Sequence, residues 1–258
     1  MPHIALQLYT LRNECEKNFE AVLDQVAQMG YEGVEFAGYW GRPAAALRAQ
    51  LDRLGIVAVS THVGMDTIRE KFPQVLRDAK TLGCKYVTVP APPSNFAGDE
   101  PAWRIFREEL KFYHVLLQHS GLALCYHNHA REFEAVEEDF VPFDWFFSKP
   151  HGFLCQLDVY WASFAGCDPS QQLRQLVGRC PLIHVKDMSK DETRRDEIPG
   201  DGCLPWRDIL GAALEAQTEW LIVEQDNPRE NAMLAVQRGL HFVKRCLREI
   251  ASQRPTTQ

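Results

Sequence analysis

Short apolar runs alternate along the chain with longer stretches in which apolar and polar residues recur at helical spacing. The short runs predict β-strands over residues 4–9, 33–37, 57–63, 86–90, 122–128, 154–160, 181–186 and 220–225. The longer stretches predict helices over residues 17–29, 42–54, 69–82, 101–119, 139–148, 170–178, 206–216 and 230–251. Several of these helices end on a glycine that leads into the next strand, as in "QMGYEGVEF" and "RLGIVAV", which is a common way for a helix to stop.

Eight strand–helix units in 258 residues predict a single (β/α)8 TIM barrel that spans residues 1–258 as one domain. A frayed tail is expected over about 252–258, where the polar sequence "SQRPTTQ" lies. An open, doubly wound sheet is the alternative. No G-x-G-x-x-G follows the first strand, where such a sheet would bind a dinucleotide, and the barrel is therefore favoured.

Composition narrows the function classes. The net charge of −7 argues against nucleic acid as a partner, because that binding needs a basic surface. No apolar run approaches the roughly 18 residues that a membrane span needs, and the start shows no signal peptide. The eight cysteines form no C-x-x-C, and Cys125 and Cys155 are predicted to face opposite ways. We therefore expect free thiols in a cytoplasmic protein with no nucleic-acid or membrane partner.

The predicted strands end on polar residues. The stretch "LCYHNHA" closes one strand with His127 and His129, which share a face because side chains alternate along a strand. Other strands carry further polar residues at the same end: Glu35, His62, Asp158, His184, Lys186, Glu224 and Asp226. In a TIM barrel these ends form the active-site face. Each residue also has a purely structural interpretation, such as a hydrogen-bonded barrel histidine or a loop cap. Together they indicate a site for a divalent metal.

Five motifs occur in a fixed order: "YHNHAREF", "QLDVYWASFAGCDP", "IHVKDM", "PGDG" and "LIVEQD". Through them the chain resembles the xylose-isomerase-like TIM-barrel superfamily, which includes sugar isomerases and epimerases as well as inosose isomerases and dehydratases. The resemblance extends from "LQLYTLR" to "LIVEQD", which is nearly the whole chain.

The resemblance implies a set of metal ligands. In the better-known epimerases Glu, Asp, His and Glu from strands 5 to 8 hold the metal, and the two glutamates exchange protons with the substrate. Asp158, His184 and Glu224 match by residue type, whereas His127 takes the place of the strand-5 glutamate. An imidazole can still bind metal or transfer a proton near neutral pH. Mn²⁺ is the first expectation for the metal, with Co²⁺, Zn²⁺ or Mg²⁺ as alternatives. Trp161 replaces a histidine usual in strand 6, and we expect it to stack on a sugar ring.

These observations lead to the hypothesis of a divalent-metal-dependent isomerase or epimerase acting on a sugar, keto-sugar or cyclitol. Glu224 is expected to remove a proton next to the carbonyl, and Lys186 to stabilise the enediolate oxygen. His127 is expected to bind metal or to transfer a proton. A lysine paired with Glu224 or Asp226 is the structural alternative for Lys186. Substrate contacts are expected from four further residues: Glu35, His62, His129 and Trp161.

Three other functions stay open at this point. A keto-inositol dehydratase would use the same intermediate, and a barrel that had lost activity would only bind sugar. DNA repair of the endonuclease IV type needs more metal-binding histidines and glutamates than the sequence offers. Arg194 and Arg195, after the seventh strand, could bind a phosphate, but such charge runs are usually solvated loops. The sequence leaves open whether the chain forms a homo-oligomer.

Overall fold

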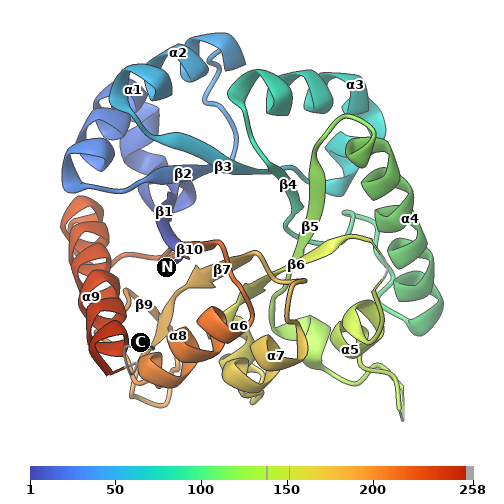
Figure 1. Cartoon of the computed structure of the whole chain (residues 1–258). Helices are drawn as coiled ribbons and strands as arrows, with labels where there is room; N and C mark the ends of the chain where they lie inside the picture. The colour runs from blue at the N-terminus through green and yellow to red at the C-terminus, as the bar shows by residue number, and fades with distance from the viewer. Residues whose placement is uncertain (138, 151, 254–258) are drawn as a thin grey trace, which may run out of the picture.

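Parallel strands close into a barrel in the computed structural model, which describes residues 1–137, 139–150 and 152–253 (Figure 1). Around the barrel the strand order is β1-β10-β7-β6-β5-β4-β3-β2, so each strand pairs with its neighbours in the chain apart from a small hairpin. The barrel strands are β1 (His3–Gln7), β2 (Gly33–Phe36), β3 (Val57–His62), β4 (Tyr86–Val89), β5 (Ala123–His127), β6 (Leu154–Asp158), β7 (Leu182–Val185) and β10 (Trp220–Val223). The predicted (β/α)8 barrel is confirmed.

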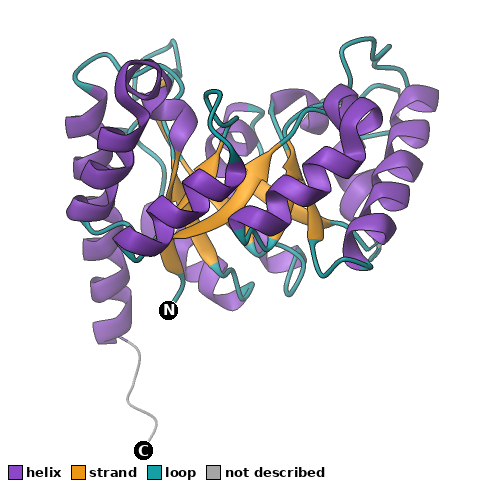
Figure 2. Ribbon diagram, turned by 90° about the horizontal axis from the view of Figure 1, so that it is seen from above, coloured by secondary structure: helices purple, strands orange, loops and turns teal. Residues whose placement is uncertain are grey.

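Helices surround the strands as an outer ring (Figure 1), and in the view turned by 90° the strands lie between them (Figure 2). The glycine helix ends are confirmed for Gly30, Gly55 and Gly83, which adopt left-handed φ values of 92°, 69° and 77° and donate their N–H groups to the preceding turn. The helices are α1 (Arg12–Met29), α2 (Ala44–Leu54), α3 (Met65–Leu82), α4 (Glu100–Gln118), α5 (Pro142–Phe147), α6 (Val159–Phe164), α7 (Pro169–Gln175), α8 (Trp206–Glu215) and α9 (Ala232–Gln253).

The end of the sixth strand differs from the prediction. The apolar run "LCQLDVY" predicted a strand through residue 160, but β6 ends at Asp158 and α6 begins at Val159. Asp158 starts this helix, because its Oδ1 accepts a hydrogen bond of 3.0 Å from the backbone N–H of Trp161. Four short elements were not predicted: the 3-10 helices Leu8–Leu11 and Ala130–Phe133, and the hairpin strands β8 (Asp187–Met188) and β9 (Asp196–Glu197).

Two layers of side chains fill the barrel. The lower layer, toward the N-terminal ends of the strands, is an apolar cluster of Ala5, Val59, Tyr86, Cys125, Leu182 and Ile222. The upper layer, toward the C-terminal ends, is polar and consists of Gln7, Glu35, His62, Thr88, His127, Gln156, His184 and Glu224. Most members of the upper layer stand two residues after a member of the lower layer, because alternate residues of a strand share a face.

A β-bulge in β3 explains why His62 belongs to the upper layer. Val34 and Glu35 of β2 pair with Ala58 and Ser60, so Val59 has no partner on β2. In a regular strand, residues 59 and 62 would face opposite sides, whereas the extra residue of a bulge lets both face inward. The bulge therefore brings His62 to the cavity at the C-terminal end of the barrel, where the sequence analysis expected it.

The cysteines are free thiols, and Cys125 lies in the lower layer while Cys155 belongs to the core cluster shared with the helices, which confirms their opposite faces. No described helix is both long enough and apolar enough to cross a membrane. Most of the expected frayed tail, at 254–258, lies outside the described residues, and residues 252 and 253 close α9.

Candidate active site

Three side chains from neighbouring strands converge at the C-terminal end of the barrel. Asp158 ends β6, His184 lies in β7 and Glu224 follows β10, and one ligand atom of each lies within 4.8 Å of the other two. His184 Nδ1 is 2.7 Å from Glu224 Oε2 and 4.0 Å from Asp158 Oδ2. All three side chains are buried. We call this set the Asp–His–Glu triad.

The ammonium group of Lys186 lies among three carboxylates. Its Nζ is 3.1 Å from Asp158 Oδ2, 2.9 Å from Glu224 Oε2 and 2.9 Å from Asp226 Oδ2. Burial disfavours the charged form of Lys186, but the three carboxylates outweigh burial and hold its pKa well above the ordinary value. Lys186 is therefore paired with Glu224 and Asp226, which is the structural alternative that the sequence analysis gave for this residue.

Glu35 is a buried carboxylate beside the triad. Its Oε2 lies 2.6 Å from His184 Nε2 and 3.1 Å from His62 Nε2, and the amides of Gln7 and Gln156 donate to it at 2.8 and 2.6 Å. Burial disfavours its charge, but His62 and His184 outweigh burial and hold the pKa of Glu35 well below its usual range. This position favours a supporting role for Glu35 over the predicted contact with substrate.

His184 joins Glu35 to the triad. Burial disfavours the charged form of His184, but Glu224 and Glu35 outweigh burial and raise its pKa to about 10. The ring presents Nδ1 to the triad and Nε2 to Glu35. Histidines that bind metal are ordinarily held in this way, with a carboxylate on the second ring nitrogen.

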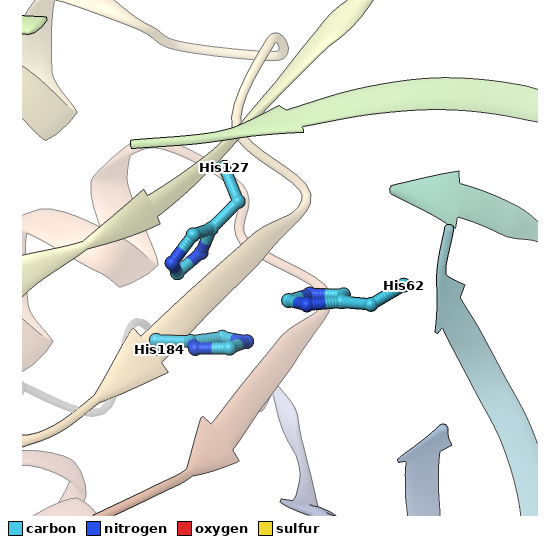
Figure 3. A group of neighbouring side chains, drawn as sticks. All are labelled: His62, His127 and His184. Carbon is cyan, nitrogen blue, oxygen red and sulfur yellow. The ribbon is translucent and has the colours of Figure 1, made fainter. Parts of the chain in front are cut away.

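Three imidazoles from β3, β5 and β7 also meet in the upper layer (Figure 3). His62, His127 and His184 each offer a ring nitrogen within 4.8 Å of the other two. The rings of His62 and His184 are parallel, with centroids 5.4 Å apart, and both Nε2 atoms face Glu35. His184 Nε2 is hydrogen-bonded to Glu35, whereas His62 Nε2 lies between Glu35 and the side-chain oxygen of Gln156, with which it forms a hydrogen bond of 2.8 Å. We therefore assign His62 and the Nε2 side of His184 to the Glu35 network and not to a second metal site.

The two histidines of "LCYHNHA" have depressed pKa values. For His127 burial is the main cause, followed by His184 and His129, and the pKa lies well below its ordinary value. Burial and the charge of Lys186 lower the pKa of His129 to about 4. Both rings are therefore neutral at pH 7, which is the form in which an imidazole binds a metal. His127 Nδ1 is buried and has no hydrogen-bond partner among the described residues, while its Nε2 lies 3.9 Å from Asp158 Oδ2.

A cavity of about 460 Å³ opens over these groups. Six rim residues noted in the sequence line it: His62, His127, His129, Lys186, Glu224 and Asp226. The sequence analysis missed four others: Tyr9, Ala37, Pro90 and Asn227. Trp161 is not in this lining. It lies on α6 with its ring 5.4 Å from that of His129, so its stacking on a sugar stays a prediction.

The triad fits a divalent metal. Two carboxylates and an imidazole are donors that Mn²⁺, Zn²⁺ and Co²⁺ accept. Asp158 Oδ2 is buried and makes no hydrogen bond among the described residues, although the Lys186 ammonium stands 3.1 Å away. Oδ1 of the same carboxylate caps α6, so one oxygen orients the side chain and the other faces the site.

The two arginines of the loop after β7 are held by protein groups in and beside that loop. The Arg194 guanidinium donates to the carbonyl of Ser163 at 2.7 Å, and Arg195 pairs with Asp191 and Glu197. Neither arginine lines the cavity. This arrangement agrees with a charge-paired loop, as the sequence pattern favoured, and offers no support for a phosphate subsite there.

Two glutamines of the upper layer were not identified from the sequence. Gln156 and Gln7 are fully buried, and both donate to Glu35. A signal was present for Gln156, because it stands two residues before Asp158 and therefore shares its face of β6. A buried amide between apolar neighbours, in phase with a candidate ligand, is a sign of a hydrogen-bond network around the site.

The closed barrel and its triad define a class of protein, namely a TIM barrel with a metal-type site on its C-terminal face. Within this class the chain belongs to the xylose isomerase-like TIM barrel family, whose model matches residues 23–246. This match confirms the resemblance that the five motifs carried.

Individual relatives are distant but extend over most of the chain. An inosose dehydratase of Geobacillus kaustophilus is 23% identical over 246 residues, which cover 80% of each chain. A sugar phosphate isomerase/epimerase structure from Parabacteroides distasonis superposes with a TM-score of 0.81 at 20% identity, and covers 94% of this chain and 97% of that one. The IOLI protein, solved with a bound zinc atom, has a TM-score of 0.74 at 16% identity, with coverage of 99% and 100%.

Proposed function

We propose that this chain is a divalent-metal-dependent isomerase or epimerase of a sugar, keto-sugar or cyclitol. The observation that carries the proposal is the position of Glu224, which belongs to the triad and also lines the cavity. The same carboxylate can therefore meet both a metal and a substrate. The zinc atom in the IOLI structure supports a divalent ion in this fold, and Mn²⁺ stays our first expectation.

A bound metal would polarise the carbonyl and the neighbouring hydroxyl of the substrate. Asp158, His184 and Glu224 would hold it, and His127 is the expected fourth ligand or proton-transfer group. Burial disfavours the charge on Glu224, but Lys186 and His184 outweigh burial and hold its pKa well below the usual value. Glu224 is therefore ionised at neutral pH, which is the state that a base requires.

The proposed reaction begins when Glu224 removes the proton next to the carbonyl. Negative charge then develops on the enediolate oxygen, and the Lys186 ammonium stabilises it. His127 lies on β5, three strands from β10 around the barrel, and reaches the cavity from another side. Its neutral ring can take up a hydroxyl proton and return it to carbon, while Glu224 gives the proton that it removed to the substrate oxygen, so that both residues regain their starting state. Return to the opposite face gives an epimer, and return to the neighbouring carbon gives an isomer.

Dehydration of a keto-inositol is the second candidate. Two relatives that are named inosose dehydratases favour it. They come from Geobacillus kaustophilus and Clostridium perfringens and are 23% and 21% identical to this chain. Their reaction type could use the same first step, after which the enediolate loses a β-hydroxyl. The residues that remove the first proton would be the same in both candidates.

Solvent exchange tests the proposal. Wild-type protein with Mn²⁺ is incubated in D₂O with a panel of keto-sugars and inososes, and NMR follows deuterium entry next to the carbonyl. An isomerase or epimerase exchanges reversibly, whereas a dehydratase also forms an unsaturated or diketo product that absorbs in the ultraviolet. Glu224→Gln should still bind the sugar but stop exchange, because the amide has no useful basicity.

Glu219→Gln is the matched control for Glu224→Gln. Glu219 lies next to β10 at the other end of the barrel, where it pairs with Lys85 and Tyr86, so its replacement should leave exchange intact. If several sugars bind but none exchanges with any divalent metal, the enzyme proposal is wrong and the sugar-binding barrel replaces it.

A further inference from the structure

Lys186 contacts the two carboxylate oxygens that are proposed as metal ligands. Its Nζ is 2.9 Å from Glu224 Oε2 and 3.1 Å from Asp158 Oδ2. These oxygens are the same ones that face His184 Nδ1, at 2.7 and 4.0 Å. A divalent ion held by both oxygens would stand beside the ammonium, and the like charges would repel.

Asp226 is a carboxylate partner of the Lys186 ammonium that lies outside the proposed set of metal ligands. Its Oδ2 is 2.9 Å from Lys186 Nζ, and it lines the cavity without belonging to the triad. The lysine side chain has a flexible four-carbon stem, so a small rotation can carry its charge from one carboxylate to another. The group can therefore leave Asp158 and Glu224 and still remain paired.

We propose that Lys186 is an internal cation that competes with the divalent metal for Asp158 and Glu224, and that metal binding leaves its ammonium paired with Asp226 alone. The inference rests on the proposed function, because it needs a metal at the triad. It goes further in assigning a role in metal affinity to two residues outside the ligand set. In this arrangement the Lys186 ammonium offsets part of the carboxylate charge before the metal arrives, so metal affinity reflects an exchange of cations.

Metal titration of variants tests the competition. Calorimetry with Mn²⁺ alone and Zn²⁺ alone should show Lys186→Met binding each ion about tenfold tighter than wild type, because no ammonium has to be displaced. Lys190→Met removes the same charge from an exposed position in the loop after β7, and should bind within about twofold of wild type. Without added metal, Lys186→Met should melt at a lower temperature than wild type, and Zn²⁺ should restore it.

A double-mutant cycle separates competition from general electrostatics. Asp226→Asn removes the carboxylate with which the displaced Lys186 ammonium would stay paired, so metal affinity should fall about tenfold in the wild-type background. In the Lys186→Met background the same change should have little effect. An equal loss in both backgrounds would mean that Asp226 acts only through its charge, and would overturn the inference. Equal or weaker binding by Lys186→Met would also overturn it.

Two further outcomes keep the inference distinct from the proposed function. Equal metal affinity in wild type and Lys186→Met overturns only the inference, whereas no binding to either protein overturns the metal-dependent function as well. If Lys186→Met does not fold, a crystal structure of wild type soaked with Zn²⁺ decides. Nζ more than about 4 Å from Asp158 Oδ2 supports the shift, and an ion pair retained there excludes it.

Discussion

The lower and upper layers of the barrel stand on the same strands but have opposite chemistry. Leu182 and Ile222 of the lower layer are fully buried in an apolar cluster, whereas His184 and Glu224, two residues further along, carry charge in a buried network. The lower layer gains stability from the burial of apolar surface. The upper layer keeps its charges only because each is paired. Substitutions in the two layers should therefore have separable effects.

The largest effect is expected from the ligands themselves. Asp158→Asn or His184→Ala should abolish turnover and weaken metal binding by at least about 100-fold, because each removes a direct ligand where even supporting residues matter by 10–100-fold. The fold should remain, since the lower layer is untouched. Metal analysis of the purified variants, with circular dichroism as the control for folding, checks both statements. Full metal occupancy in both variants would refute the ligand assignment.

A substitution that leaves a cavity in the lower layer should lower stability and leave metal binding nearly unchanged. Ile222→Ala should lower the free energy of unfolding by about 2–5 kcal/mol, because it removes buried methyl groups from a packed cluster. Metal affinity should change by less than about twofold, since no charged group of the triad is altered. Urea denaturation and calorimetry measure the two quantities. A large loss of metal affinity here would show that the layers are not separable.

A substitution of Glu35 separates, within the upper layer, the residues that bind metal from those that support them. Glu35→Gln keeps the shape of the side chain but removes the charge that faces His184 Nε2. We expect metal affinity to fall about 10–100-fold, the usual effect of losing a carboxylate that orients a metal-binding histidine. Calorimetry with Mn²⁺ measures it, and Glu219→Gln serves again as the control. Unchanged affinity would contradict the supporting role assigned to Glu35.

Metal affinity should also depend on pH, and this effect is the smallest when it is expressed per pH unit. The pKa of His184 is about 10, so the ring carries a proton on Nδ1 as well as on Nε2 at neutral pH. A metal at Nδ1 must displace one proton, and affinity should therefore rise with pH, by up to about tenfold per unit below pH 10. Calorimetry between pH 6 and pH 8 (roughly the range in which Mn²⁺ stays soluble), in buffers of different ionisation enthalpy, counts the protons released. Affinity that falls as pH rises would exclude this account.

Much of the fold could be predicted because each βα unit has its own periodicity and several helices have a glycine stop. The triad could be predicted because Asp158, His184 and Glu224 are polar ends of apolar runs. The end of β6 could not, because "VYWASF" is equally suited to a strand or a short helix. The inward direction of His62 depends on the bulge at Val59, which arises from pairing with another strand. Such long-range pairing leaves no local pattern in the sequence.

The contacts of Asp158 Oδ1 provide a natural reporter for the site. One oxygen of this carboxylate receives the backbone N–H of Trp161, and the other faces the triad. Any change in charge at the second oxygen redistributes electron density over both. The amide resonance of Trp161 in an NMR spectrum should therefore follow occupancy of the site, although this amide lies outside the triad. The chain thus carries its own spectroscopic probe, and a titration can be observed without attaching a label.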